Sequence, residues 1–372
     1  MRRLALNSSE RMVFDNSSTS QMIEGKINEA LCDKPSNSSP EMLEALAVIY
    51  MVSSFLSIIG SLSIIMYSCC KRIVCNFEIN PLFHLSLADF FLACGWFVTT
   101  SLWWVHRHDS PKNAEACFYL EIATETFHVA SFFLTVNYAT HVFVRIKQRT
   151  RDSGSHGFFY RKLFFVLYLL SWVAPILLML PMLVYYTRND FIDCSWCLLL
   201  FDRPKARWYD ENGIEVTKTK NYAWRNYGSL VLVITLGVSI GLLLVLYFMA
   251  VKNFTSVIKR SGLLSIQQRE LIERNKKRVM WYIVVFFICW LPAFVVAIID
   301  LATEDEGYSF ENWFVVFLIE GIFTPLQGFL NSLVYGWTRN SFRRISENSR
   351  RPLLSPDRFT TSMYGAISQR VA

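Results

Sequence analysis

The run FFICWLPAFVVAIID, residues 286–300, decides the fold class of this chain. Nearly all of it is apolar, yet Pro292 stands in the middle, shortly after Cys289 and Trp290. In a soluble helix an internal proline removes one backbone hydrogen bond and costs about 3 kcal/mol. In a membrane the kink is tolerated, because neighbouring helices and water satisfy the freed carbonyl. The run therefore predicts a kinked transmembrane helix.

The whole chain has the composition of a membrane protein. Of its 372 residues, 53% are hydrophobic and 15% are aromatic, which is too apolar for an ordinary soluble protein. Seven runs reach the length of about 20 residues that crosses a bilayer, and none of them contains Lys or Arg. They lie at 46–68, 81–104, 117–144, 163–187, 227–251, 279–302 and 312–337. We predict an all-α membrane protein, a seven-transmembrane helix bundle.

The distribution of charge predicts the orientation of the bundle. The segments 71–80, 145–162, 252–278 and 338–372 together hold 23 basic and only six acidic residues. The other connections and the N-terminal tail hold 14 basic and 19 acidic residues. Because cytoplasmic loops collect Lys and Arg, we predict that the N-terminus lies outside and the C-terminus inside.

Three regions follow from this layout. We expect an extracellular glycosylated tail over 1–44, a seven-transmembrane domain over 45–337, and a cytoplasmic region over 338–372 with a short amphipathic eighth helix and a disordered tail. The tail has sequons at Asn7, Asn16 and Asn37, a pattern that also arises by chance in Ser/Asn-rich tails. The basic stretches RNKKRVMWY and RNSFRRIS either anchor to anionic membrane lipid or contact a partner. A multi-pass protein of the plasma membrane is expected.

Cysteine usage agrees with the orientation. Four of the nine cysteines fall in predicted extracellular segments, where stable disulfides form: Cys32, Cys117, Cys194 and Cys197. A bridge from Cys117, which begins the third span, to the CSWC sequence would tie the long loop after the fourth span over the mouth of the bundle. The sequence does not choose between Cys194 and Cys197 as the partner.

Several motifs in register resemble the seven-helix G-protein-coupled receptors, over about residues 45–345. CWLP, ending at Pro292, resembles the sixth-helix motif of that family. NSLVY, residues 331–335, resembles the seventh-helix Asn-Pro-x-x-Tyr with Ser332 in place of proline. LSLAD, ending at Asp89, resembles the second-helix motif, and Ser61 stands where receptors usually carry asparagine.

The resemblance implies a G-protein-coupled receptor that transmits an extracellular signal to a heterotrimeric G protein. The inner end of the sixth helix would swing about Pro292, with Trp290, Asn331 and Tyr335 as the other switch residues. A packing kink without a switching role is the alternative.

The resemblance also implies a polar site around an ion and water at mid-membrane. Asp89 and Asn331 would form it, with Ser61 and Ser332 as further partners. A protonated Asp89 bonded to a backbone carbonyl is the alternative.

Two departures from the family matter. HVF, at 141–143, stands where rhodopsin-like receptors carry Asp-Arg-Tyr, so the usual arginine contact to the sixth helix is missing. The seventh helix has no lysine, which excludes a retinal Schiff base. The strings GFLNSLVYGW, ICWLPAFVVAI and CSWC are similar to the slime-mould cyclic-AMP-receptor-like group and its animal relatives of the transmembrane protein 116 kind.

Acids within spans are costly in hydrocarbon and usually functional or paired. Five lie in the spans or at their borders: Asp89, Glu121, Glu125, Asp300 and Glu320. Because no span carries Lys or Arg, none of them has such a partner at its own depth. They must be protonated, hydrated, or paired with a cation or cationic ligand.

A ligand site is predicted in the outer half of the bundle. Glu121, Glu125 and His128 follow i, i+4, i+7 spacing with Thr124 between them, which makes a polar stripe that should face the cavity. Simple solvation is the alternative for Glu121. Glu320 lies at the same depth as Glu125, and the resemblance places Trp290 beneath the ligand. We expect a small cationic ligand, a basic peptide or protons as the ligand. We do not expect a nucleotide.

Other classes of function are less well supported. We find no Gly-x-Ser-x-Gly, no His-Glu-x-x-His and no paired inward aspartates, so we expect no enzyme, no catalytic residue, no metal and no cofactor. No nucleic-acid partner is expected either. A transporter or a proton or ion channel would also place carboxylates in spans, but no internal repeat is found. That class stays the alternative, as does a receptor-like protein that does not couple to a G protein.

Overall fold

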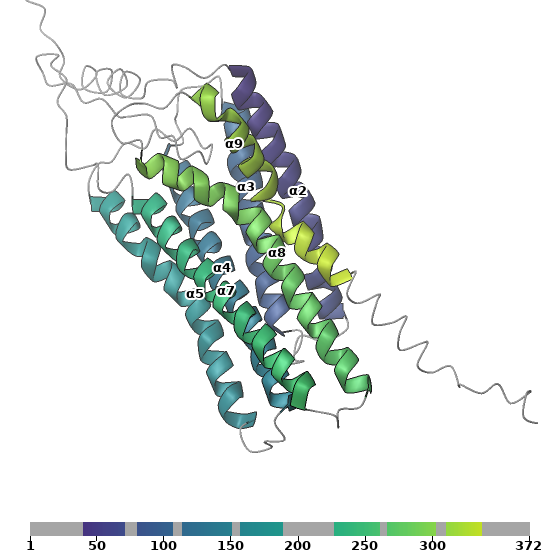
Figure 1. The fold of residues 1–372 in the computed structure, drawn as a ribbon. Helices are drawn as coiled ribbons and strands as arrows, with labels where there is room; N and C mark the ends of the chain where they lie inside the picture. Colours follow the sequence, from purple (N-terminus) through teal and green to yellow (C-terminus); the bar gives the residue numbers. More distant parts are fainter. Residues whose placement is uncertain are drawn as a thin grey trace, which may run out of the picture.

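The computed structural model describes residues 40–70, 80–106, 114–150, 157–188, 227–260, 266–302 and 310–336 (Figure 1). These residues are helical apart from a turn at 324–326, and no strand occurs among them. The helices are α2 (Pro40–Cys70), α3 (Asn80–His106), α4 (Ala114–Thr150), α5 (Gly157–Arg188), α7 (Tyr227–Arg260), α8 (Ile266–Ala302) and α9 (Phe310–Phe323), followed by a short helix over 327–336. The predicted all-α class is confirmed for the described residues.

Six of these helices are long and apolar enough to cross a membrane, as predicted. The seventh predicted span instead consists of α9 and the 327–336 helix, which meet at an angle of 46°. Pro325 lies in the turn between them, and it cannot donate the backbone hydrogen bond that would continue the helix. The described residues thus hold six spans by length and composition, or seven if this bent pair crosses as one span.

The other prolines inside spans do not break their helices. Pro175 and Pro181 lie within α5, and Pro292 lies within α8. The predicted hinge in α8 is therefore a proline inside a continuous helix, whereas the sharp break of the bundle is in the seventh span.

The helices form a closed ring. α2 packs on α3, α3 on α4, α4 on α7, α7 on α8, α8 on α9, and α9 returns to α2. α4 also contacts α8 across the ring. α5 lies at the periphery of the bundle, against α4 and α7 (Figure 1). α4 therefore takes part in contacts with α3, α5, α7 and α8, and a change along it reaches most of the bundle.

Apolar side chains cover the outside of the bundle, and polar ones lie inside it. Phe165 on α5 is 71% exposed and Val315 on α9 is 63% exposed, which suits a surface in lipid. In contrast, Asp89, His128 and Glu320 are each 2% exposed. Buried polar groups of this kind need partners inside the protein, so their contacts define the site described below.

Two glycines let α2 and the 327–336 helix approach each other closely. A Cβ atom at Gly60 would lie 2.5 Å from the Cα atom of Phe329, and a Cβ atom at Gly328 would lie 2.1 Å from the Oγ atom of Ser61. The amide of Gly328 also donates a hydrogen bond of 3.1 Å to Ser57 Oγ. These contacts hold the inner part of the bent span against α2.

Several predictions fall outside the described residues. These are residues 1–39 of the predicted extracellular tail with Asn7, Asn16 and Asn37, the eighth helix after residue 337, the cytoplasmic tail, and the loop cysteines Cys32, Cys194 and Cys197; residues 40–44 of the predicted tail are instead the first residues of α2. They stay predictions, and so does the orientation of the bundle. We use "outer" below for the predicted extracellular end, where α4 and α9 begin.

Candidate functional site

The outer half of the bundle contains a continuous row of polar and aromatic contacts that joins four helices. Glu320 on α9 accepts a hydrogen bond from the hydroxyl of Tyr50 on α2. The ring of Tyr50 stacks on Trp96 of α3, with centroids 4.6 Å apart and planes within 5°. Trp96 Nε1 donates to Nε2 of His128 on α4 over 3.1 Å.

The row ends in a carboxylate and imidazole pair on α4. The Nδ1 atom of His128 lies 3.2 Å from Oε2 of Glu125, three residues earlier on the same helix, although the two groups are not aligned as a hydrogen bond. We call Glu320, Tyr50, Trp96, His128 and Glu125 the outer polar chain.

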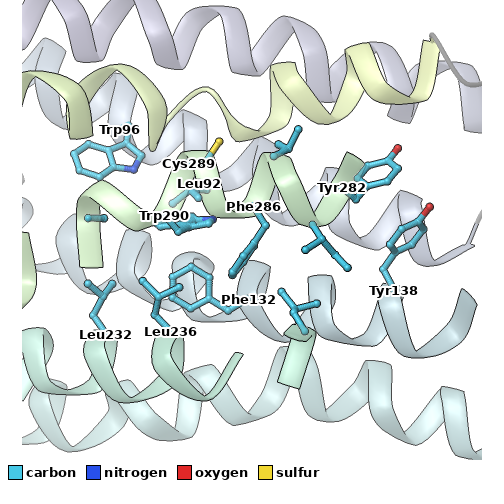
Figure 2. Packing of buried hydrophobic residues seen from close by; sticks show 14 of the residues in the cluster. Leu92, Trp96, Phe132, Tyr138, Leu232, Leu236, Tyr282, Phe286, Cys289 and Trp290 are labelled. Atoms are coloured by element: carbon cyan, nitrogen blue, oxygen red, sulfur yellow. The ribbon is translucent and has the colours of Figure 1, made fainter. Parts of the chain in front are cut away.

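Trp290 on α8 lies directly inward of this chain and is fully buried. The ring of His128 meets it edge to face, with centroids 5.0 Å apart. Phe132, one turn further along α4, packs against it at 4.5 Å in the same manner (Figure 2). The indole Nε1 donates to Oε1 of Gln327 in the helix that follows the break.

Below Trp290, four polar side chains form what we call the inner polar cluster. Gln327 Nε2 donates to Ser131 Oγ over 2.9 Å, and Ser131 Oγ in turn donates to Asp89 Oδ1 over 2.9 Å. Asn331 Nδ2 donates to Asp89 Oδ2 over 2.8 Å. Both oxygens of the buried carboxylate therefore accept hydrogen bonds, from α4 and from the 327–336 helix.

The break at Pro325 places the residues of this cluster. The amide of Thr324 still donates to the carbonyl of Glu320 over 2.9 Å, which closes the last turn of α9. The Thr324 hydroxyl donates to the carbonyl of Cys289 on α8 over 3.1 Å. The chain then turns and continues as the 327–336 helix, so that Gln327 and Asn331, one turn apart, both lie inside the bundle.

Most residues of the predicted ligand site come together in the structure. Glu125, His128 and Glu320 are members of the outer polar chain, and Trp290 contacts it through His128. Thr124 lies elsewhere: it is buried against α3, where a Cβ at Gly95 would lie 2.4 Å from its hydroxyl oxygen, and it donates to the carbonyl of Leu120.

Two predicted span acids, Glu121 and Asp300, are not part of the contacts described above. Glu121 is half-buried on α4, one turn outward of Glu125. The side chain of Asp300 lies outside the described residues.

The expectation that span acids lack a basic partner needs one correction. It considered only Lys and Arg, whereas Glu125 has the imidazole of His128 within 3.2 Å. Glu320 has a hydroxyl partner in Tyr50. The predicted cationic ligand would therefore compete with contacts that already exist inside the bundle.

The predicted ion-like site is assembled around Asp89 and Asn331, but not around the two serines. Ser332 Oγ donates to the carbonyl of Phe329 in its own helix. Ser61 is fully buried, and its hydroxyl finds no hydrogen-bond partner. Ser131 takes the place that the prediction gave to these serines.

Of the predicted switch residues, Asn331 and Tyr335 lie inward of Trp290, whereas Pro292 follows Trp290 on α8 toward the outer end. Pro292 is half-buried in α8, and Asn331 belongs to the inner polar cluster. Tyr335, one turn further, packs near Tyr67 of α2 with ring centroids 6.1 Å apart.

Sequence reasoning missed Tyr50, Trp96, Ser131, Gln327 and the break at Pro325. Gln327 and Pro325 carried a readable signal, since a glutamine and a proline inside an apolar run are unusual. Tyr50 and Trp96 carried none, because aromatic residues are common throughout the spans.

Cys117 is buried at the start of α4. It is not among the free cysteines of the described residues, which are Cys69, Cys70, Cys94 and Cys289. Since Cys194 and Cys197 lie outside the described residues, the predicted pairing stays a prediction.

The arrangement of helices and buried polar residues defines a multi-pass helical membrane protein of receptor-like type. The sequence profile of the family described as Transmembrane protein 116 matches residues 43–355. The match covers most of the chain, and the chain belongs to this family.

Two curated relatives are more distant. The chain is similar to cyclic AMP receptor-like protein C of Dictyostelium discoideum, at 20% identity over 278 residues, which covers 72% of this chain and 65% of the relative. It is also similar to human relaxin receptor 2, at 27% identity over 145 residues, which covers 37% of this chain and 18% of the relative. The chain thus spans less than two thirds of the length of each relative.

Proposed function

We propose that this protein is a G-protein-coupled receptor that passes a signal from the extracellular side to a heterotrimeric G protein. The observation that carries the proposal is the unbroken series of contacts from Glu320, through Trp96 and His128, to Trp290 and on to Asp89. A ligand that moves one end of this series must rearrange the other, because the groups are buried and closely packed.

The series reaches α8 beside its internal proline. Pro292 leaves the carbonyl of Ile288 without its usual backbone donor, and Thr324 bonds the next carbonyl, that of Cys289. The backbone of α8 is therefore least constrained by its own hydrogen bonds immediately next to Trp290. A change at Trp290 would tilt the inner half of α8 about Pro292.

A tyrosine pair closes the inner half of the bundle. Tyr138 on α4 and Tyr282 on α8 meet with ring centroids 4.8 Å apart (Figure 2), and the Tyr282 hydroxyl donates to the carbonyl of Asn331 over 3.4 Å. His141, at the position of the missing arginine motif, packs instead on Phe164 of α5 at 4.7 Å. We infer that the tyrosine pair holds α8 against α4 in the resting receptor, in place of the arginine contact.

The ligand class follows from the outer polar chain. Two carboxyl groups, those of Glu125 and Glu320, belong to it, and no span contributes Lys or Arg. A cationic ligand, an amine or a basic peptide, would find two carboxyl groups, whereas a phosphate ligand would find no Lys or Arg side chain in the spans. The cyclic nucleotide in the name of the slime-mould relative is therefore not proposed as the ligand.

Heterotrimer dissociation in cells tests this function without a known ligand. The chain would be expressed at the plasma membrane of cells that lack endogenous Gα subunits, with one Gα class added at a time, and dissociation followed by energy transfer. We expect basal dissociation with at least one class, increased by Tyr138→Ala and left near the wild-type value by Tyr138→Phe, which keeps the ring contact.

The main alternative is a transporter or channel, and the same cells distinguish it. No dissociation with any Gα class for the wild type or Tyr138→Ala, at normal surface expression, would overturn the receptor proposal. Proton current or solute flux that depends on Glu125 and Glu320 would then support the alternative.

A further inference from the structure

His128 is a buried titratable side chain at the junction of the outer polar chain and Trp290. It is 2% exposed, and both of its ring nitrogens have a neighbour. Trp96 Nε1 lies 3.1 Å from Nε2, and Glu125 Oε2 lies 3.2 Å from Nδ1. Its ring and that of Trp290 are nearly perpendicular, with centroids 5.0 Å apart.

The contact with Trp96 fixes the protonation state of the imidazole. An indole N–H can only donate a hydrogen bond, so Nε2 of His128 must accept it and carry no proton. The single proton of the neutral ring is then on Nδ1, facing the carboxylate of Glu125. A second proton on Nε2 would place two N–H donors against each other.

We propose that His128 is a proton-binding site, and that protonation separates it from Trp96 and changes the packing of Trp290. The added proton comes from the extracellular solution and forms an N–H bond at Nε2, with no other bond made or broken. Histidine is the side chain that ordinarily changes charge between about pH 5 and 8. This inference rests on the proposed receptor function for its physiological meaning, but not for its chemistry.

Both ends of the site respond to this proton. The charged ring gains attraction to Glu125, and its positive charge lies beside the indole of Trp290, whose ring centroid is 5.0 Å away. Trp96, no longer held by His128, still stacks on Tyr50. Because Tyr50 is the hydrogen-bond donor to Glu320, the movement of Trp96 reaches the last turn of α9.

The titratable groups around His128 come from five helices. Glu125 lies on α4 itself, Tyr50 lies on α2 behind Trp96, Glu320 lies on α9 beyond Tyr50, and Cys289 lies on α8 next to Trp290. On α3, Asp89 lies one layer inward and is bonded to Ser131 and Asn331. Leu232 and Leu236 of α7 belong to the same buried cluster as Trp96 and Trp290 (Figure 2).

None of the titratable side chains named above is cationic. Glu125 is the nearest, and it faces Nδ1 in either protonation state.

The test follows indole N–H signals of the purified full-length chain in lipid nanodiscs. The protein would carry 15N-labelled tryptophan, with the signals of Trp96 and Trp290 assigned as those lost in Trp96→Phe and Trp290→Phe. We expect both signals to shift between about pH 7.5 and 5.5. In His128→Gln they should stay unchanged, because an amide can accept from Trp96 and face Glu125 but cannot take up the proton.

A second variant keeps the test independent of folding failures. Trp96→Phe removes the opposing N–H donor and keeps an aromatic ring on Tyr50, so the shift of the Trp290 signal should have its midpoint at a higher pH than in the wild type. Wild-type signals that do not move, or that move equally in His128→Gln, overturn the proton site.

Coupling is measured separately, so that the two proposals can fail separately. In the Gα-deficient cells, wild type should change its basal heterotrimer dissociation about tenfold over the same pH range, and His128→Gln should not. Shifts of the indole signals without any dissociation at any pH would support the proton site and contradict the receptor function.

Discussion

Gln327 is the member of the inner polar cluster that bonds to Trp290. It accepts from the indole of Trp290 and donates to Ser131. Gln327→Leu removes both bonds at nearly constant volume and leaves the indole N–H buried without an acceptor. A buried donor without a partner costs about 1–3 kcal/mol. Ser131 still donates to Asp89, so the loss at that end is smaller.

Gln327→Leu destabilises the resting state of the bundle, because both bonds of Gln327 are present in that state. If tilting of α8 separates Trp290 from Gln327, the variant should shift the equilibrium toward the tilted state by about tenfold. Basal heterotrimer dissociation at matched surface expression is the assay. Ser332→Ala is the control, since that hydroxyl bonds only within its own helix and links no other element.

Basal dissociation equal to that of wild type in Gln327→Leu, with normal expression, would refute the proposed path through Trp290. A parallel rise in Ser332→Ala would refute it as well, because the effect would then come from general loosening of the 327–336 helix.

Three further predictions address the close helix contact, the disulfide and the ligand. Gly328→Val should lower the thermal unfolding temperature in detergent, since a side chain there meets serine hydroxyls on α2 and overpacking costs about 1–3 kcal/mol; Gly336→Val, with nothing within 4 Å of a Cβ, should not, and equal stability of the two variants would contradict the contact. Cys117→Ser should reduce surface expression and expose one more free thiol; normal expression without a new thiol would disprove the bridge. Glu125→Gln with Glu320→Gln should weaken cationic agonists at least tenfold, measured as potency in a screen of cationic and anionic ligands; a phosphate agonist indifferent to both changes would refute the electrostatic reasoning.

The spans could be predicted from the sequence because one physical signal determines them. Hydrocarbon excludes Lys and Arg, so their absence from seven long runs marks each span, and six of them appear as helices at those positions. The break of the seventh span was not predicted, although Pro325 lies within it. The resemblance to Asn-Pro-x-x-Tyr draws the eye to Ser332, where the family has its proline. The chain instead bends at Pro325, seven residues earlier.

The site could be predicted only where polarity itself was the signal. Asp89, Glu125, His128 and Glu320 stand out in apolar runs, and the structure joins each of them to the buried contacts. Their partners could not be found in this way. Tyr50 is one aromatic residue among many, and its role depends on which faces of α2 and α9 meet.

The serines of the inner cluster show the same limit of sequence reasoning. The register of a receptor motif predicts Ser61 as a partner of Asp89, yet Ser131 donates the hydrogen bond to Asp89. Helical spacing fixes the face on which a side chain lies, but hydroxyl partners are decided by the distance between helices. Because Gly328 has no side chain, α2 approaches so closely that the Ser61 hydroxyl lies against the backbone of Gly328.

The most direct test of the account is the distance between α4 and α8 at the inner end of the bundle. Lys147 on α4 and Lys277 on α8 are both exposed and can each be replaced by a spin-labelled non-natural amino acid, which leaves the nine native cysteines in place. Distance distributions would be measured by pulsed electron resonance in nanodiscs, with and without nucleotide-free heterotrimer.

The account predicts one distance for the protein alone and a second, longer distance when the heterotrimer is added. Pro292→Ala should suppress the longer distance, because it restores the backbone hydrogen bond of α8. Tyr138→Ala should produce part of it without heterotrimer. A single distribution that neither the heterotrimers of any Gα class nor Tyr138→Ala changes would contradict the claim that α8 moves about Pro292 to admit a G protein.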